Sequence, residues 1–414
     1  MIYLRILSDF LFFFFSLFIV STAFSIAVAQ ISLGVSLFLF IVIIFLRKEN
    51  PFAGALSKFY IAIGLYIFWM ILSALFSDTP LASLLILKEE WLFCAIPIGI
   101  YILQKESFRK KITASLFTAL FIIGLYGVIQ HFTGVHWFKT ELYEAFDSGY
   151  IAKGFFPHRL TFGNYTITAL AFVVGYLLFN FKDFSFFKKI SLSFVYFLLA
   201  FATLYSYSYG PILTLLITVL IFAVMKFRKY AVYAIIVLAV GAVSFIYTQP
   251  NLQKRISTRI NKEFAEGNEA SRFYIWKNAG VMITENPLFG VGQGNFYQTF
   301  EENMPGHRIH VHAHNDLINI AAIGGIPAML FFAAFWFLYF KYLLAGIYKQ
   351  KHLEKYKMYL TAAILAGIAF FCTSLTEATF ADEEVRQFLM AVFAFGLFPF
   401  VSKEAKNNEK VGNQ

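Results

Sequence analysis

Residues 316–340 read DLINIAAIGGIPAMLFFAAFWFLYF, a run with a single charge at its first position. A helix of this length and composition can cross the hydrocarbon core of a membrane. Comparable apolar runs recur along the chain, near 10–28, 30–46, 59–76, 84–103, 113–132, 162–181, 190–206, 209–226, 231–248, 358–376 and 387–402. The pattern predicts an all-α, polytopic membrane helix bundle of about twelve transmembrane helices. Residues 190–226 are split at Tyr207–Gly210, because Gly210 and Pro211 permit a break.

The composition excludes an ordinary soluble domain. Hydrophobic residues make up 59% of the 414 residues, charged residues only 14%, and the mean hydropathy is +0.68. The net charge of +10 comes mostly from residues between apolar runs, so it indicates membrane topology rather than binding to nucleic acid. The two cysteines, Cys94 and Cys372, lie inside apolar stretches, which excludes a disulfide framework and a cysteine-rich metal site.

The N-terminus has some features of a signal peptide. Arg5 precedes an apolar run from Phe10, and Ala27-Val28-Ala29 stands before Gln30. The apolar stretch is longer than a usual signal core. The alternation of basic and non-basic loops along the chain is consistent only if this helix is retained. We expect a retained first transmembrane helix.

Basic residues occupy alternate loops, which predicts the orientation. One set of loops holds Arg47, Lys48, Lys58, Lys105, Arg109, Lys110, Lys111, Lys182, Lys188, Lys189, Lys226, Arg228, Lys229, Lys349, Lys351, Lys355 and Lys357. The other short loops hold only Lys88, Lys139, Lys153, Arg159 and Arg386. We expect both termini in the cytoplasm, one membrane domain over 1–402, a polar cytoplasmic tail over 403–414, and long periplasmic loops near 133–161 and 249–315.

The longer of these loops has sequence signals for short amphipathic helices. Apolar residues recur at helical spacing between Ser271 and Thr284, which predicts a helix lying on the membrane or over the bundle. Pro287 and the run Gly290-Val291-Gly292-Gln293-Gly294 predict a turn after it. No strand precedes this glycine run, so it is poor evidence for a nucleotide site.

The densest polar cluster follows, and it leaves three interpretations open. Its members are His307, Arg308, His310, His312, His314, Asn315 and Asp316. Alternating histidines suit metal ligands. A histidine at the membrane face could instead act as a general base. The third interpretation is an interfacial loop whose histidines are solvated.

Three motifs resemble the O-antigen ligase/O-antigen polymerase superfamily of bacterial envelope proteins. His314, Asn315 and Gly325 fit its usual pattern of His, a small polar residue, nine residues and Gly. A second block comprises Arg272, Trp276, Pro287, Gly290, Gly292, Gly294 and Phe296 in the family's order. A third, Gly154-Phe155-Phe156-Pro157-His158-Arg159 with Thr161, Phe162 and Gly163, resembles the loop before the sixth span in many relatives.

Two positions depart from the family pattern. Ala328 stands where the His motif usually ends in Gly, Thr or Tyr. Relatives commonly carry Ser-Arg-Gly between the seventh and eighth spans, whereas this chain has Ser208-Tyr209-Gly210. Tyr209 cannot supply a cation, so Arg159 or Arg308 would have to replace the arginine. An inactive relative with a binding role gains some weight from Tyr209.

The resemblance implies a glycosyltransferase of the bacterial inner membrane. Its donor would be a glycan on undecaprenyl pyrophosphate, and its acceptor a sugar hydroxyl on lipid A-core in a ligase or on another carrier-linked glycan in a polymerase. It implies no cofactor, no metal and no nucleic acid. His314 would be the general base, since imidazole has an ordinary pKa of about 6.5. Pyrophosphate binding would fall first to Arg272, then to Arg159 and Arg308, with Asn315, His312, Trp276 and Gly325 in support.

Two acidic groups have open roles. Glu377, Asp382, Glu383 and Glu384 could shape an acceptor site, bind a cation or form a solvated turn. Lys88-Glu89-Glu90 reads as a helix-end charge cluster, although a charge inside a bundle would indicate function.

A transporter or flippase is the alternative from another class. Such proteins carry broken or charged spans at the membrane midplane, often in internal repeats. The sequence shows no repeat and few charges within spans, which favours chemistry at the membrane surface.

Overall fold

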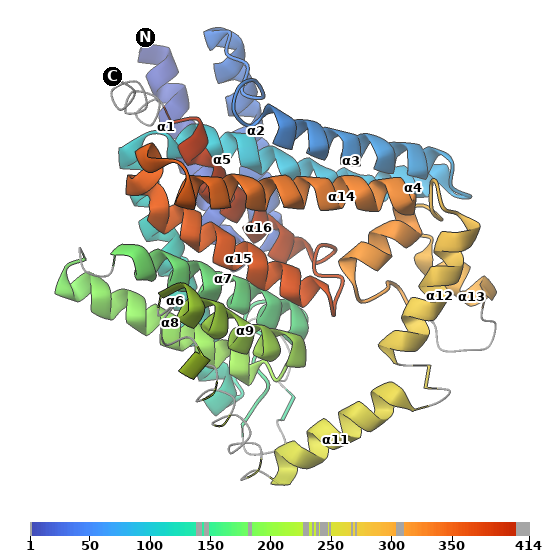
Figure 1. Cartoon of the computed structure of the whole chain (residues 1–414). Helices are drawn as coiled ribbons and strands as arrows, with labels where there is room; N and C mark the ends of the chain where they lie inside the picture. The colour runs from blue at the N-terminus through green and yellow to red at the C-terminus, as the bar shows by residue number, and fades with distance from the viewer. Residues whose placement is uncertain are drawn as a thin grey trace.

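The computed structural model describes residues 2–137, 143–144, 149–180, 184–226, 250–265, 268–269, 271–303 and 310–402, with isolated positions between 232 and 247. Among these residues the regular elements are helices, and no β-strand occurs (Figure 1). The longer helices are α1 (Ile2–Ser21), α2 (Ile26–Arg47), α3 (Ser57–Leu75), α6 (Glu106–Thr133), α7 (Arg159–Asn180), α8 (Phe186–Tyr205), α9 (Tyr209–Lys226), α11 (Pro250–Phe264), α12 (Arg272–Glu285), α14 (Asp316–Tyr348), α15 (Lys357–Ser374) and α16 (Glu383–Leu397). Short helical segments complete the bundle: α4 (Pro80–Ile86), α5 (Ala95–Leu103), α13 (Phe296–Asn303), and 3₁₀ turns at Leu87–Cys94, Lys351–Tyr356 and Phe398–Phe400.

Eight helices in the described residues are long and apolar enough to cross a membrane. They are Ile2–Ser21, Ile26–Arg47, Ser57–Leu75, Glu106–Thr133, Arg159–Leu178, Phe186–Tyr205, Asp316–Tyr348 and Lys351–Ser374. The total of about twelve spans stays a prediction. The predicted span 231–248 lies largely outside the described residues, as does the predicted tail 403–414.

Two predicted spans differ from the observed helices. The run 84–103 forms three segments, α4, a 3₁₀ turn and α5, and the turn contains Glu89 and Glu90. Both carboxylates accept hydrogen bonds from the Arg386 guanidinium, at 3.3 and 3.2 Å, so this charge cluster faces the bundle. The run 10–28 straddles the turn between α1 and α2, because Ser25 caps α2 by accepting a hydrogen bond from the Val28 N–H.

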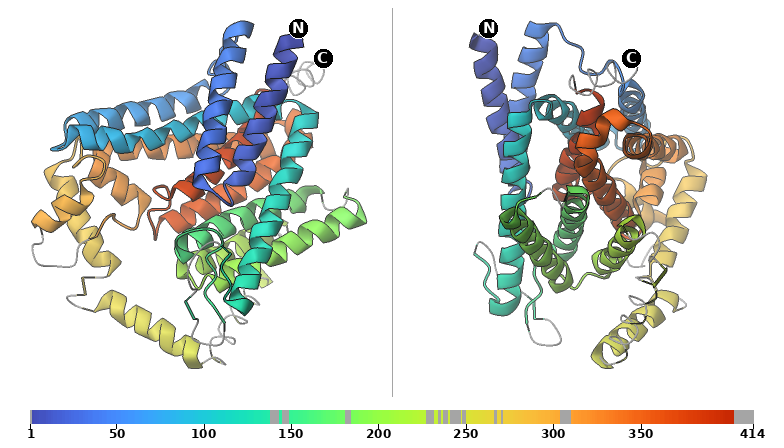
Figure 2. Two further views of the ribbon diagram at one scale, coloured as in Figure 1. Left: turned by 180° about the vertical axis from the view of Figure 1, so that it is seen from behind. Right: turned by 60° about the vertical axis from the view of Figure 1, so that its left-hand side comes forward.

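Three helices form the centre of the bundle. Residues Glu384–Leu397 of α16 are all buried, and most of α7 and α15 is buried with them. The close crossing of α7 and α15 depends on Gly175, where a Cβ atom would lie 2.5 Å from the Ala362 Cα atom. The other helices surround this centre, with α3 and α14 on one side and α6, α8 and α9 on the other (Figures 1 and 2).

The glycine run has a structural role in the long helix α14. Gly325 has φ of 78° and ψ of 171°, so α14 is interrupted there. The carbonyl oxygens of Ala322 and Ile323 then accept hydrogen bonds from the Val291 and Gly292 N–H groups, both at 2.9 Å. The run 290–294 is therefore a turn, as predicted, and it fastens the segment after α12 to the broken helix.

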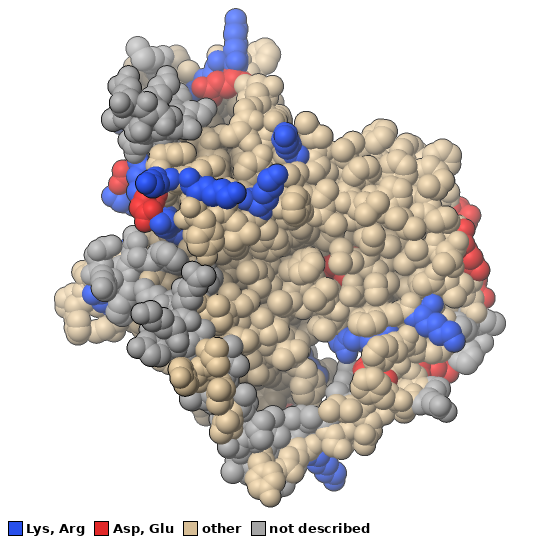
Figure 3. Space-filling view, in the orientation of Figure 1, with Lys and Arg blue, Asp and Glu red and all other residues tan. Residues whose placement is uncertain are grey.

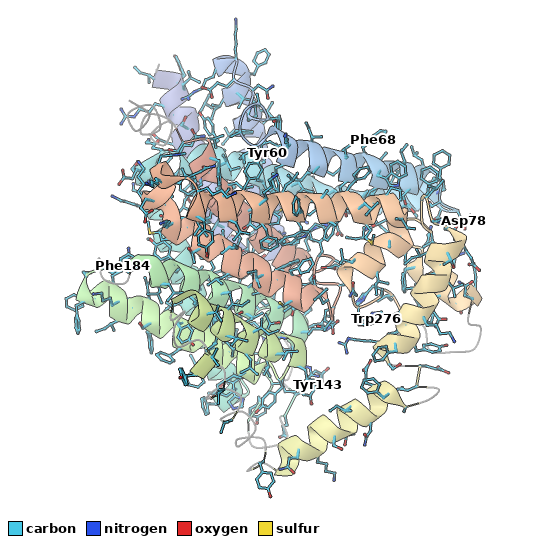
Figure 4. The ribbon with its side chains drawn as sticks, in the orientation of Figure 1. Tyr60, Phe68, Asp78, Tyr143, Phe184 and Trp276 are labelled. Atoms are coloured by element: carbon cyan, nitrogen blue, oxygen red, sulfur yellow. The ribbon has the colours of Figure 1, made fainter. Side chains whose placement is uncertain are left out.

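Several connecting segments meet at one end of the bundle. Figure 4 shows Asp78, after α3, and Trp276, on α12, on the same side of the molecule, whereas Phe184, between α7 and α8, lies at the far side. The start of α14, the start of α7 and the turn between α15 and α16 share the end marked by Trp276. The polar residues singled out by their sequence motifs lie in these segments.

Candidate functional site

Glu377 joins two of the predicted site residues. Its Oε1 atom accepts a hydrogen bond from the Arg272 Nη2 group, and its Oε2 atom lies 2.7 Å from Nδ1 of His314. Glu377 is 7% exposed. Burial alone would raise the pKa of this carboxyl, but the hydrogen bond and charge of His314, followed by the charge of Arg272, outweigh burial and lower it. Glu377 is thus an anion held between two cationic or polarisable partners.

The backbone of His314 is in an uncommon conformation. Its φ is +50°, in the left-handed region that a residue with a Cβ atom seldom adopts. The His314 N–H donates to Nδ1 of His312 at 3.2 Å, and the two imidazole rings meet edge to face at 4.2 Å. Burial lowers the pKa of His312 to about 4, with the charge of His314 acting in the same direction. His312 is therefore a neutral acceptor that supports the turn at neutral pH.

One face of α12 supports both sides of the His314–Glu377 contact. Ser271 caps the helix by accepting from the Tyr274 N–H at 3.1 Å, which fixes where α12 begins. Arg272 and Trp276 lie four residues apart, so their side chains share a face. Arg272 Nε donates to the Thr376 carbonyl at 2.8 Å, and Trp276 Nε1 donates to the Ala313 carbonyl at 2.9 Å. The helix predicted over Ser271–Thr284 is confirmed as Arg272–Glu285.

Asn315 connects the start of α14 to the segment that follows α15. Its Oδ1 atom accepts from the Ile318 N–H at 3.1 Å and caps α14, while its Nδ2 group donates to the Leu375 carbonyl at 3.1 Å. Asp316 is buried, and its carboxylate accepts from the Phe380 N–H at 3.0 and 3.1 Å. Both contacts bind the start of α14 to the turn between α15 and α16, the turn that carries Glu377.

A cleft of about 650 Å³ opens beside His314 and Glu377. Its polar and charged lining is Tyr143, Lys153, His158, Arg159, Thr161, His312, His314, Glu377 and Asp382. Two cationic side chains, Lys153 and Arg159, therefore face the same space as His314. Burial, followed by the charge of Glu384, raises the pKa of Asp382 to about 7. This volume is large enough for a ligand with several rings or phosphate groups.

Arg159 lies against the segment in which relatives usually carry an arginine. Its Nη1 group donates to the Tyr207 carbonyl at 3.2 Å, and its own carbonyl accepts from the Ser208 hydroxyl at 3.3 Å. Tyr209, which stands in the arginine's place, is half exposed at the start of α9. The two candidate positions, 159 and 209, thus belong to one local structure.

The predicted site residues have different placements. The lining of the cleft includes His312, His314 and Arg159. The segments that form its wall receive hydrogen bonds from Arg272, Trp276 and Asn315. Gly325 lies at the break in α14 and fixes the segment behind the site. Arg308 lies outside the described residues, as does His307.

His310 and the acidic turn have placements that the sequence left open. His310 is buried, with Nε2 2.8 Å from the Glu269 carbonyl. Within the described residues, no three His, Cys, Asp or Glu side chains form a group that could hold a metal ion. The sequence did not predict the central position of Glu377, because its segment reads like a solvated acidic turn. Only the fold brings it to Arg272 and His314.

Comparison with known protein families agrees with the motifs. Residues 194–333 match the family model described as O-antigen ligase, a range that begins within α8, includes α9, α12 and the whole His314 motif, and ends within α14. No curated protein matches the chain. The match supports membership of the O-antigen ligase/O-antigen polymerase superfamily and a function like that of its membrane glycosyltransferases. The eight apolar helices of the described residues indicate a multi-pass membrane protein.

Proposed function

We propose that this protein is an O-antigen ligase that moves a glycan from an undecaprenyl pyrophosphate carrier to a sugar hydroxyl of lipid A-core. The observation that carries the proposal is the contact of His314 with Glu377 at the wall of a cleft lined by Lys153 and Arg159. It joins a general base to cationic groups in one space, which the transfer of a glycan from a pyrophosphate requires.

His314 takes the proton of the acceptor hydroxyl. With a proton on Nδ1, His314 donates to Glu377, and the lone pair of Nε2 is then the basic site. The hydroxyl oxygen forms a bond to the anomeric carbon while the bond from that carbon to the pyrophosphate oxygen breaks. The hydroxyl proton passes to Nε2, and Glu377 stabilises the imidazolium that results. The leaving group is the carrier pyrophosphate.

Arg159 is the cation that we assign first to this pyrophosphate, with Lys153 beside it. Both line the cleft, whereas Arg272 donates to Glu377 and to the Thr376 carbonyl and reaches the cleft only through them. A guanidinium can bind a phosphate with two parallel hydrogen bonds and keeps its charge at any physiological pH. Arg272 is then a positioning residue that holds Glu377 ionised. Arg308 stays a third candidate, outside the described residues.

The orientation follows from the positive-inside rule. We place both termini in the cytoplasm, residues 1–402 in one membrane domain, and the loops near 133–161 and 249–315 in the periplasm. Two observations support this orientation. The cleft is built from residues of both long loops, and Leu4 and Ser402, near the two ends of the described chain, line one other cavity. Reaction at the periplasmic face would meet the carrier-linked glycan where it is exposed.

A gene deletion in the host tests the proposal. The deletion strain is complemented with the native sequence, His314→Ala, Arg272→Ala or Lys277→Gln, and lipopolysaccharide and carrier-linked glycan are separated on gels. Lys277 is an exposed residue of α12 that does not line the cleft, so its variant controls for changes of charge on that helix. Membrane levels of every variant are compared by immunoblot.

The gel pattern separates the possible functions. If the protein is a ligase, its deletion leaves core-only lipopolysaccharide with long glycan still on its carrier, and the His314 and Arg272 variants do not restore long-chain lipopolysaccharide. Lipopolysaccharide with single repeat units would instead identify a polymerase. Full rescue by His314→Ala would overturn the assigned chemistry and favour transport or binding.

A further inference from the structure

A second cavity, of about 620 Å³, lies at the opposite end of the bundle from His314. It is bounded by the start of α1, the end of α2, the end of α5 and the start of α6. Helix α6 runs from this cavity towards the site, where the carbonyl of His131 accepts a hydrogen bond from the Tyr150 N–H close to the cleft. The volume is within the range of small-molecule sites, and no feature of the proposed transfer reaction uses this cavity.

The cavity has an excess of positive charge. Arg5, Arg47 and Lys105 line it against a single carboxylate, Glu49, whose Oε1 atom is 3.9 Å from Arg47 Nη1. The Lys105 ammonium lies 3.7 Å from the centre of the Phe108 ring. In the described part of the chain, no ion pair joins Arg5 or Lys105 to a carboxylate. Three cations on converging helix ends suit a phosphate group.

Ser8, Gln104 and Ser402 add polar groups to the same lining. The Ser8 hydroxyl donates to the Leu4 carbonyl at 2.7 Å, and the Ser402 hydroxyl shares a hydrogen bond with Tyr356 at 3.1 Å. The Gln104 amide is therefore the group of these three that can donate to a phosphate oxygen. The apolar part of the lining comes from Leu4, Leu11, Ile102 and Phe108. The cavity therefore combines a cationic centre with an apolar wall, which is the chemistry of a lipid headgroup next to its acyl chains.

The outer surfaces of the same helix ends are apolar and exposed. Ile6 is 46% exposed and Phe10 54% on α1, and Phe45 is 79% exposed and Leu46 53% on α2. In a membrane these side chains would contact acyl chains, directly beside the cations. Figure 3 shows Lys and Arg side chains gathering towards the end of the bundle near the chain termini, beyond an extended uncharged surface. A free phosphate ion would make no contact with this apolar surface, whereas the acyl chains of a lipid would.

We propose that this cavity binds the headgroup of an anionic phospholipid of the phosphatidylglycerol class. Arg5, Arg47 and Lys105 hold its phosphate, and its acyl chains lie along α1 and α2. The lipid links the first helical hairpin to α5 and α6, two helices that come later in the chain. This site is independent of glycosyl transfer, and neither proposal depends on the other.

Native mass spectrometry of the detergent-purified full chain tests the proposal. The protein is mixed with equal amounts of phosphatidylglycerol and zwitterionic phosphatidylethanolamine, and retained lipid is counted. The test variant combines Arg5→Gln, Arg47→Gln and Lys105→Gln. The control combines Lys110→Gln, Lys349→Gln and Lys351→Gln, which removes as much charge from exposed residues outside the cavity. Size-exclusion chromatography and thermal melting of both variants establish folding, and the single variant Arg5→Gln, at the exposed start of α1, replaces any triple variant that fails to fold.

The expected result is retention of phosphatidylglycerol over phosphatidylethanolamine by the native chain and by the control variant. The test variant should bind phosphatidylglycerol at least about tenfold more weakly, and Arg5→Gln alone several-fold more weakly. Equal retention of both lipids, or undiminished phosphatidylglycerol binding by the test variant, would overturn the proposal. Displacement of the lipid by millimolar inorganic phosphate would also overturn it, because the site would then take an anion rather than a lipid.

Discussion

The Nδ1 atom of His314 lies 2.7 Å from Oε2 of Glu377, a residue 63 positions later in the chain. The other carboxylate oxygen of Glu377 accepts a hydrogen bond from Arg272, at the start of α12. Three segments far apart in sequence are therefore joined by one carboxylate. This carboxylate therefore contributes to the stability of the fold as well as to the chemistry that we propose.

Glu377→Gln should destabilise the protein as well as inactivate it. The substitution leaves the Arg272 guanidinium without its anionic partner, and breaking a fully buried ion pair costs about 3–5 kcal/mol. Because the Arg272 side chain is 24% exposed, we expect the smaller loss of roughly 2–3 kcal/mol. Thermal or denaturant unfolding in detergent measures the change. The double variant Arg272→Gln with Glu377→Gln should recover most of this stability but no glycan transfer, and independent, additive losses would contradict the pairing.

Gly325→Ala should weaken the fold behind the site. Gly325 has a positive φ, and a Cβ atom there would overlap the carbonyl oxygen of Leu288. We expect a loss of roughly 3 kcal/mol or more, seen as a lower melting temperature. Gly280→Ala is the matched control, because no atom lies within 4 Å of its Cβ position on α12. It should stabilise by about 0.5–1 kcal/mol, and an equal loss at both positions would show that the break in α14 is not the cause.

The sequence predicted the parts of the molecule that local patterns determine. The spacing of apolar residues between Ser271 and Thr284 specified α12 within one residue at each end, and Gly210 with Pro211 marked the break between α8 and α9. The His314 motif was found because its residues are close together in the chain. The break of the run 84–103 was missed, since the contacts of Glu89 and Glu90 with Arg386 come from distant sequence.

Glu377 could not be assigned for the same physical reason. An isolated carboxylate near Asp382, Glu383 and Glu384 has the composition of a solvated turn. Its burial, and the two partners that make burial tolerable, exist only after α12, α14 and α15 have packed. Arg159 was a candidate in the sequence, but its contact with Tyr207 also depends on the packing of α7 against α8 and α9.

His312 should make stability depend on pH. Its pKa falls from the ordinary 6.5 to about 4 in the folded protein, mainly through burial, so the unfolded chain binds its proton first as pH falls. The native protein should therefore lose stability from about pH 6.5 down to about pH 4, relative to His312→Gln. In the folded protein the pKa of Asp382 is about 7, so this residue adds stability as pH falls over the same window. Both proteins contain Asp382, so the comparison with His312→Gln removes its contribution. Melting curves of both proteins from pH 4 to 8 measure the difference, and parallel curves would contradict the assignment.

Arg159→Gln should weaken binding of the carrier-linked donor. A hydrogen bond to a charged group contributes about 1.5–3 kcal/mol, so KM for the donor should rise about 10- to 100-fold. Lys277→Gln should leave KM unchanged. Adding Tyr209→Arg to the Arg159 variant should restore part of the affinity, because position 209 begins α9 beside the Tyr207 carbonyl that Arg159 contacts. An unchanged KM in Arg159→Gln would transfer the pyrophosphate role to another cation.

The most direct test of the His314 assignment is the rate of glycan transfer by purified protein in liposomes. Native protein, His314→Gln and Lys277→Gln are supplied with carrier-linked glycan and lipid A-core, and single-turnover rates are measured at saturating donor. General-base catalysis contributes about 10²- to 10⁴-fold, so the His314 variant should be slower by that factor while its donor affinity and melting temperature stay close to native. A native rate in His314→Gln would contradict the assignment of His314 as the base.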